Sequence, residues 1–301
     1  MMQAAPSADV FTGITSGTES SASGPRLSAD QLTTLRRDGF LLVHGMASRE
    51  EIARLQSLYD RLFAERRGWD KGDLFDMVGR DEAGKAAALP QMLWPSRYEP
   101  ELGTSQLARS ARSIAEQILG PQLENMLEHA ILKPAAKGAA TPWHQDEAFN
   151  RKGSGFEESI SIWMPLQDVT VESGCMRYIS GSNHGPLMDH RSPNNDPTIH
   201  GLETVATPDL THCKDVPMPA GSGVIHLSRT IHSAGPNTSG QPRRAYILGF
   251  AVQSTRHKLL SRDYPWNLEK QTARDKRELM SLPPLRRTLR RIRRMLRGQK
   301  F

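Results

Sequence analysis

The chain lacks the sequence features that are typical of disulfide-rich, membrane-spanning and secreted proteins. It contains two cysteines in 301 residues, Cys175 and Cys213, so we expect neither a disulfide framework nor a thiolate metal site. It has no run of about 18 apolar residues, so no transmembrane helix is predicted. The N-terminus lacks the basic and apolar segments of a secretory signal. We therefore expect a reduced, cytoplasmic protein with one large or two small domains.

The chain also has little net charge once its C-terminal end is set apart. The formal net charge is +6 at pH 7, but residues 285–301 hold eight basic side chains and no acidic one. Removing these eight charges leaves the rest of the chain at −2. A protein body that binds nucleic acid should have a basic face of its own. We therefore expect no nucleic-acid partner and assign the basic character to a tail.

The order of segments predicts helices first and short strands afterwards. Residues 1–26 are rich in Ser, Gly, Thr and Ala, which is typical of a disordered leader. Capping-box patterns at Ser28 and Ser48 each begin a predicted helix, and a third helix is predicted over residues 105–119. Strands are predicted over residues 40–43, 128–133, 160–166, 175–179, 223–227 and 244–252. This order favours a mainly β fold, a sandwich or barrel with helical support.

The sequence Trp143-His144-Gln145-Asp146 indicates a metal site. In a strand, His144 and Asp146 would point to the same face, because successive side chains alternate. His232, 86 residues after Asp146, is the best candidate for a third ligand. Two histidines and one carboxylate form the facial triad of non-haem Fe(II) oxygenases, which leaves coordination positions open. His226 remains a rival third ligand, although a buried, hydrogen-bonded histidine is the simpler interpretation of it.

These residues belong to a longer ordered pattern. The pattern consists of His144-Gln145-Asp146, Trp163, Gly174-Cys175-Met176-Arg177, Ser180-Gly181-Ser182-Asn183-His184, His232 and, eleven residues later, Arg243. From about residue 27 to residue 250 the chain resembles the phytanoyl-CoA dioxygenase family of Fe(II)- and 2-oxoglutarate-dependent oxygenases. The resemblance implies a double-stranded β-helix, a cupin-like jelly roll with N-terminal helices packed on one sheet.

The resemblance also implies a chemistry. His144, Asp146 and His232 match the family's iron ligands, with 2-oxoglutarate and O2 as cosubstrates. The implied reaction converts 2-oxoglutarate to succinate and CO2 and hydroxylates an unactivated C–H bond of a small-molecule or lipid-like substrate. Because the carboxylate of Asp146 is present, hydroxylation is favoured over halogenation. Two alternatives stay open: a non-catalytic, metal-binding or scaffold jelly roll, and the same cofactors performing desaturation or ring formation in natural-product biosynthesis.

Three further residues are assigned to the cosubstrate pocket by the resemblance. Arg243 matches the arginine that pairs with the far carboxylate of 2-oxoglutarate, and a planar guanidinium suits that task. Arg243 shares its strand face with small side chains and Arg244 with bulky ones, which favours Arg243. Trp163 matches a pocket aromatic residue. Ser233 is assigned there as well, although Ala234 occupies the family's serine position.

Two segments outside the pattern have predicted roles of their own. Residues 181–221 form a long polar connection, which is typical of a lid over a substrate. Residues 283–301 are predicted to be a separate basic amphipathic tail after an oxygenase domain of residues 27–282. The apolar positions of the tail fall on one helical stripe: Leu285, Leu289, Ile292 and Leu296. Such a helix favours peripheral contact with an anionic membrane, here the inner membrane surface.

Overall fold

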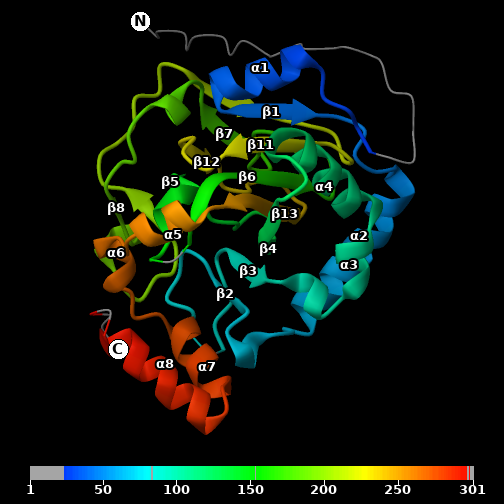
Figure 1. Cartoon of the computed structure of the whole chain (residues 1–301). Coiled ribbons are helices and arrows are strands. Elements are labelled where there is room, and N and C mark those ends of the chain that lie inside the picture. Colours follow the sequence, from blue (N-terminus) through cyan, green and yellow to red (C-terminus); the bar gives the residue numbers. More distant parts are fainter. Residues whose placement is uncertain (1–23, 83, 153, 297, 299–301) are drawn as a thin grey trace, which may run out of the picture.

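The larger of two β-sheets lies at the centre of the computed structural model, which describes residues 24–298 except 83, 153 and 297 (Figure 1). Its seven strands run in the order β1-β11-β6-β13-β4-β3-β2 and pair antiparallel throughout. They are β1 (Phe40–Val43), β2 (Leu74–Asp76), β3 (Pro90–Leu93), β4 (Glu124–Lys133), β6 (Phe156–Pro165), β11 (Gly223–Leu227) and β13 (Arg243–Gln253).

The smaller sheet has four strands in the order β10-β7-β12-β5. They are β5 (Thr141–His144), β7 (Met176–Ile179), β10 (Cys213–Val216) and β12 (His232–Ala234). In the pairing of β12 with β5, His232 lies directly opposite His144. A separate pair, β8 (His190–Arg191) and β9 (Glu203–Thr204), lies in the connection from β7 to β10.

The N-terminal helices cover the outer face of the larger sheet (Figure 1). They are α1 (Ala29–Asp38), α2 (Arg49–Ala64), α3 (Pro100–Thr104) and α4 (Gln106–Leu119). Ser28 accepts a hydrogen bond from the Gln31 backbone and so caps α1, which ends at Gly39 because that residue adopts a left-handed φ of 84°. Apolar side chains of α2, such as Leu55 and Tyr59, pack against the sheet in one buried cluster.

A second apolar cluster fills the space between the two sheets. Trp163, Val224 and Ile247 come from the larger sheet, and Tyr178 and Ala234 come from the smaller one. Two antiparallel sheets packed face to face, with helices on the outside of one, form a jelly roll with helical support. This architecture confirms the predicted fold, and it places the strands that end in His144 and begin at His232 side by side.

Helices also follow the last strand. They are α5 (Thr255–Leu260), α6 (Pro265–Leu268), α7 (Ala273–Ser281) and α8 (Pro284–Leu296). Short 3-10 turns occur at η1 (Trp69–Lys71), η2 (Pro95–Arg97), η3 (Asp146–Phe149), η4 (Ser182–His184) and η5 (Pro193–Asn195). Helices α7 and α8 lie at the end of the molecule opposite α1, beyond β2 (Figure 1). The side chain of Arg277 in α7 stacks over the Trp69 ring at 3.7 Å and pairs with Asp81.

Two local expectations differ from the structure, and the leader lies mostly outside it. Strand β5 ends at His144, and Asp146 begins the 3-10 turn η3, so the premise that both residues lie in one strand was wrong. No strand was predicted within residues 67–104, yet β2 and β3 lie there and extend the larger sheet. The predicted disordered leader falls almost wholly on residues 1–23, outside the described residues.

Candidate metal centre and cosubstrate pocket

Three side chains of metal-ligand type converge on one point in a cavity. They are His144 at the end of β5, Asp146 in η3 and His232 in β12, and their ligand atoms all lie within 4.8 Å of one another. The Nε2 atom of His144 is 3.6 Å from Oδ1 of Asp146, and Nε2 of His232 is 3.5 Å from the same oxygen. The fold therefore brings together the three residues that the sequence nominated as iron ligands.

The backbone determines which ring nitrogen each histidine can offer. Nδ1 of His144 lies 2.8 Å from the carbonyl oxygen of Pro142, and Nδ1 of His232 lies 2.9 Å from that of Thr230. A carbonyl oxygen only accepts, so each Nδ1 carries the proton and donates it. The lone pair of each Nε2 is then directed toward Asp146 and is free for a metal.

The protonation states of the three residues suit a divalent metal. Burial lowers the pKa of His144, and burial holds the pKa of His232 well below its ordinary value. Burial opposes ionisation of Asp146, but the nearby His232, His226 and His144 outweigh it and hold the carboxyl pKa well below normal. Neutral imidazoles and an ionised carboxylate are the forms that bind metal. The residues present therefore fit an Fe(II) ion.

The second carboxylate oxygen of Asp146 is held by other partners. Ser161 Oγ donates to Oδ2 at 2.6 Å, and His226 Nε2 lies 3.1 Å from the same oxygen. The Tyr178 hydroxyl in turn lies 3.0 Å from Nδ1 of His226. These contacts orient the carboxylate so that Oδ1 points at the other two ligand residues. The geometry thus favours His232 as the third ligand and gives His226 a positioning role.

A buried arginine lies in the same cavity as the three ligand residues. Arg243 is 1% exposed, lines the cavity, and its Nε and Nη1 atoms have no hydrogen-bond partner among the described residues. Burial lowers the pKa of Arg243 to about 10, so the group is charged at neutral pH. An unpaired buried cation is costly. A carboxylate of a bound ligand would satisfy it, so the pocket fits 2-oxoglutarate.

The neighbouring arginine faces the other way. Nε of Arg244 lies 2.6 Å from Oδ1 of Asp60. A second, parallel contact joins Nη2 of Arg244 to Oδ2 of Asp60 at 2.7 Å. Asp60 belongs to α2, on the outer face of the sheet. Because alternate side chains of a strand point to opposite faces, only Arg243 of the two faces the cavity.

Of the other two residues predicted for the cosubstrate pocket, one lines the cavity and one does not. Trp163 is buried and lines the cavity, and its ring centroid lies 5.2 Å from the guanidinium carbon of Arg243. Ser233 does not line the cavity, whereas His232 and Ala234 on either side of it do. Strand alternation turns the Ser233 side chain away, and this placement opposes its predicted cosubstrate role.

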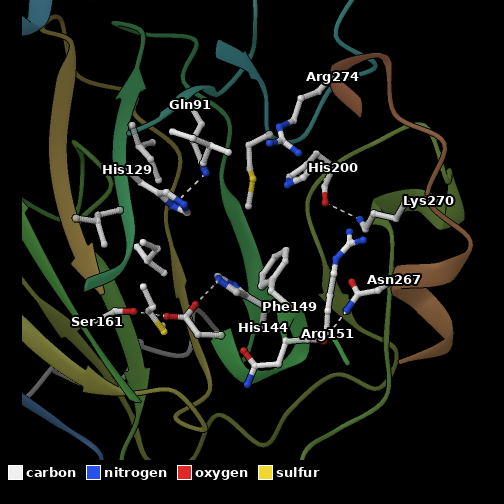
Figure 2. Close-up of a pocket in the computed structure, with 18 of the residues that line it drawn as sticks. Gln91, His129, His144, Phe149, Arg151, Ser161, His200, Asn267, Lys270 and Arg274 are labelled. Carbon is white, nitrogen blue, oxygen red and sulfur yellow. Dashed lines mark hydrogen bonds and ion pairs between the residues drawn. The ribbon is translucent and has the colours of Figure 1, made fainter. Parts of the chain in front are cut away.

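The cavity extends well beyond the ligand residues, with a volume of about 990 Å³. Figure 2 shows His129 and Gln91 on one side, and His200, Arg274 and Lys270 on the other. The amide nitrogen of Gln91 lies 3.1 Å from Nδ1 of His129, and burial lowers the pKa of that histidine to about 4. A neutral His129 therefore faces the space in front of the ligand residues.

Sequence reasoning missed much of this outer wall. His200 lies in the long polar connection that is predicted to be a lid over a substrate, and it lines the cavity. Arg151, Lys270 and Arg274 were not singled out, and they line it too. No local motif marks them, because they meet only when α7 and the segment before it fold back toward β2 and β3 (Figure 1).

The long connection of residues 181–221 is tied to the body at several points. The Gln145 side chain accepts a hydrogen bond from the Met188 backbone at 2.8 Å and donates to the Pro186 carbonyl at 3.3 Å. Nζ of Lys270 donates to the carbonyl of Ile199 at 3.1 Å and to that of Gly201 at 2.5 Å. The connection is thus part of the cavity wall, and its opening as a lid stays a prediction.

Comparison with known proteins places this site in a family. Residues 35–245 match the sequence model of phytanoyl-CoA dioxygenase. The L-proline trans-4-hydroxylase of Streptomyces griseoviridis is 31% identical over 154 residues, which cover 46% of this chain and 58% of that protein. The chain thus spans less than two thirds of that curated relative.

Solved structures extend the similarity to more of the chain. EvdO2 of Micromonospora carbonacea var. aurantiaca, complexed with 2-oxoglutarate, is 37% identical with a TM-score of 0.64, over 77% of this chain and 94% of that one. The epimerase SnoN, in complex with Fe3+, alpha ketoglutarate and nogalamycin RO, is 26% identical with a TM-score of 0.57. The match covers 74% of this chain and 82% of SnoN. Within the part of the chain that the structure covers, no helix has the length and apolar character needed to cross a membrane. The resemblance seen in the sequence is confirmed by these matches: the chain belongs to the phytanoyl-CoA dioxygenase family.

Proposed function

We propose that the chain is an Fe(II)- and 2-oxoglutarate-dependent dioxygenase that hydroxylates an unactivated C–H bond of a small-molecule substrate, with residues 27–282 as the oxygenase domain. One observation carries the proposal. A buried arginine, Arg243, has two nitrogens without a hydrogen-bond partner among the described residues and lies in the same cavity as the metal-ligand group of His144, Asp146 and His232. A metal-binding scaffold would have no need for an uncompensated cation beside its metal.

Each residue of the site has a definite task in this function. His144, Asp146 and His232 would hold the iron, and Asp146 would offset part of its charge. Arg243 would bind the far carboxylate of 2-oxoglutarate and so fix its orientation. Trp163 packs beside that guanidinium and keeps water away from it. When bound, iron with 2-oxoglutarate and O2 supplies the oxidation, from which succinate and CO2 leave and one oxygen atom enters the substrate.

The outcome of the oxidation depends on how the substrate lies. SnoN, a solved relative with iron and alpha ketoglutarate, is an epimerase, so the same cofactor set can serve reactions other than hydroxylation. Desaturation and ring formation are therefore the alternative outcomes for this chain. The product of the true substrate distinguishes them, because only hydroxylation adds an oxygen atom.

The proposed function predicts iron-dependent consumption of 2-oxoglutarate by the purified protein. Supplied with Fe(II) and O2, the protein should release one succinate for each 2-oxoglutarate consumed, measured by chromatography, and faster when a library compound is a substrate. Protein loaded with Zn(II), which has no redox chemistry, is the matched control and should release none. Bound iron without any consumption of 2-oxoglutarate would support the scaffold alternative instead.

Peripheral contact with an anionic membrane is a second candidate function, and α8 favours it. The apolar stripe of the helix is largely uncovered: Leu285 is 74% exposed, Ile292 is 47% exposed and Leu296 is 82% exposed. Arginines flank this stripe, and each basic residue near an anionic surface contributes about 1 kcal/mol of binding free energy. An apolar stripe bordered by arginines fits the boundary between headgroups and acyl chains.

The membrane proposal predicts that the protein pellets with phosphatidylglycerol vesicles at low salt. The combined variant Leu285→Gln, Ile292→Gln and Leu296→Gln keeps every arginine and should stay in the supernatant, because only the apolar insertion is lost. Co-sedimentation measures both. Equal pelleting of the two proteins would show charge attraction alone, and no pelleting of either would refute membrane contact.

A further inference from the structure

The outer part of the cavity is strongly basic. Away from the three ligand residues and Arg243, its lining includes one lysine and six arginines among the described residues, against two acidic residues, Asp275 and Glu278. Four of the arginines belong to α8, the helix that begins at Pro284. The tail helix is therefore part of the cavity wall, and its charge faces the same space as the site.

Both acidic residues are already paired within the wall. Glu278 Oε1 lies 2.7 Å from Nη2 of Arg290, which joins α7 to α8. Oδ1 of Asp275 lies 3.0 Å from Nη1 of Arg274, and its Oδ2 lies 3.8 Å from Nη2 of Arg294. These pairs hold α8 in place with its arginine-bearing face inward. They leave no acidic side chain of this wall to neutralise the remaining cations.

Three cavity arginines have no such partner. In the part of the chain that the structure describes, Arg151, Arg286 and Arg293 form no ion pair and no side-chain hydrogen bond. All three line the cavity, Arg151 partly buried and Arg286 and Arg293 exposed at its rim. Arg151 lies two residues after the end of η3, the 3-10 turn that begins at Asp146. Unpaired guanidinium groups gathered in a partly enclosed space repel one another unless an anion lies between them.

The ionisation of neighbouring groups reports the same positive field. Burial lowers the pKa of Arg151, and Arg294 and Arg274 lower it further against the opposing effect of Asp275 and Asp263. Burial also holds the pKa of His200 well below normal, and the cations Arg274, Lys270 and Arg151 add to this effect. Within the described part of the chain, the Nδ1 atom of this neutral histidine has no hydrogen-bond partner.

The cavity changes character between this basic region and the ligand residues. Figure 2 shows the ring of Phe149 between His144 and Arg151, and Leu89 and Met77 also line the cavity. A ligand that spans it would meet cations at one end and an apolar, metal-facing space at the other. The charged group would therefore bind away from the carbon that is oxidised.

We propose that the basic region formed by Arg151 and the α8 arginines binds a phosphate or diphosphate group of the substrate. Guanidinium groups suit this ligand, because each can donate two parallel hydrogen bonds to phosphate oxygens. The substrate class is then a phosphorylated small molecule whose neutral part reaches the metal. This assignment of substrate rests on the proposed oxygenase function, whereas anion binding by the basic region does not.

Calorimetric titration of the full chain with inorganic pyrophosphate, without iron, tests the proposal. Saturable binding at one site per chain is expected, persisting in the presence of 2-oxoglutarate because Arg243 is a separate site. Arg151→Gln should weaken binding by about ten- to a hundredfold, the effect of losing a charged hydrogen bond. Because Arg151 is partly buried, its replacement also tests folding. Arg293 is exposed, so Arg293→Gln serves as a second variant and should likewise weaken the binding of pyrophosphate.

The matched control is Arg291→Gln, on the same helix but outside the cavity lining. It removes the same charge and should leave the affinity for pyrophosphate unchanged. An equal loss in Arg291→Gln and Arg151→Gln would show unspecific charge attraction and overturn the proposal, as would the absence of saturable binding. If pyrophosphate binds but the iron-loaded protein consumes no 2-oxoglutarate, the oxygenase function fails while the anion site stands.

Discussion

Replacement of His232 by alanine is expected to abolish iron binding and, with it, all iron-dependent consumption of 2-oxoglutarate. The residue supplies one of three ligand atoms grouped within 4.8 Å, and its Nδ1 is already occupied by the Thr230 carbonyl. Without Nε2, only His144 and Asp146 remain to hold the ion. Metal analysis of the loaded protein and a succinate assay measure the two losses.

The matched control variant for this experiment is His226→Gln. His226 contacts the outer oxygen of Asp146 rather than the ligand group, so its loss should weaken iron affinity by about ten- to a hundredfold without abolishing turnover at saturating iron. A glutamine amide can still donate to Oδ2 of Asp146, which keeps the variant conservative. Full iron and activity in His232→Ala, together with loss of both in His226→Gln, would make His226 the third ligand.

Replacement of Arg243 by leucine is expected to raise the apparent KM for 2-oxoglutarate by about ten- to a hundredfold, the range for losing a charged hydrogen bond. The buried guanidinium has two nitrogens without a partner, and a cosubstrate carboxylate is the group that would satisfy them. Leucine removes the buried, uncompensated charge and introduces none, so the substitution should not lower the melting temperature by burying a charge. Steady-state kinetics at varied 2-oxoglutarate measures the effect.

The neighbouring residue supplies the control for the second experiment. Arg244→Leu removes the same side chain one position along β13, but from the outer face, where the arginine pairs with Asp60. Its KM for 2-oxoglutarate should equal that of the unaltered protein. A normal KM in Arg243→Leu, with a large increase in Arg244→Leu, would reverse the assignment of the two strand faces.

The position of α8 changes the interpretation of the basic tail. Four of its arginines line the cavity, and two of these, Arg290 and Arg294, also pair with α7. By contrast, Leu285, Ile292 and Leu296 of its apolar stripe lie outside the cavity lining and are exposed. The proposed substrate recognition and the proposed membrane contact would thus use different faces of one helix. The pyrophosphate titration depends on Arg151 and Arg293, and vesicle binding depends on Leu285, Ile292 and Leu296, so either can fail without the other.

Elements whose signals are local could be predicted from the sequence alone. The capping box at Ser28 and the left-handed Gly39 bound α1 because both act through backbone groups only a few residues away. The predicted order of helices first and short strands afterwards, among them the strands now seen as β6, β11 and β13, indicated the supported β fold for the same reason. The ordered pattern of His144, Asp146, His232 and Arg243 likewise nominated the candidate site before any contact was known.

Contacts between distant segments could not be predicted in this way, because they form only when the chain folds. Asp146 reaches the ligand group from a 3-10 turn and not from a strand, because Ser161 and His226, on neighbouring strands, hold its carboxylate. Ser233 was nominated from its position in the pattern, yet strand alternation turns it from the cavity. The basic region depends on Arg151 lining the same cavity as α8, which begins more than 130 residues later in the chain. The local sequence around Arg151 or α8 does not indicate this arrangement, because it forms only when α7 packs on the body and places α8 at the cavity.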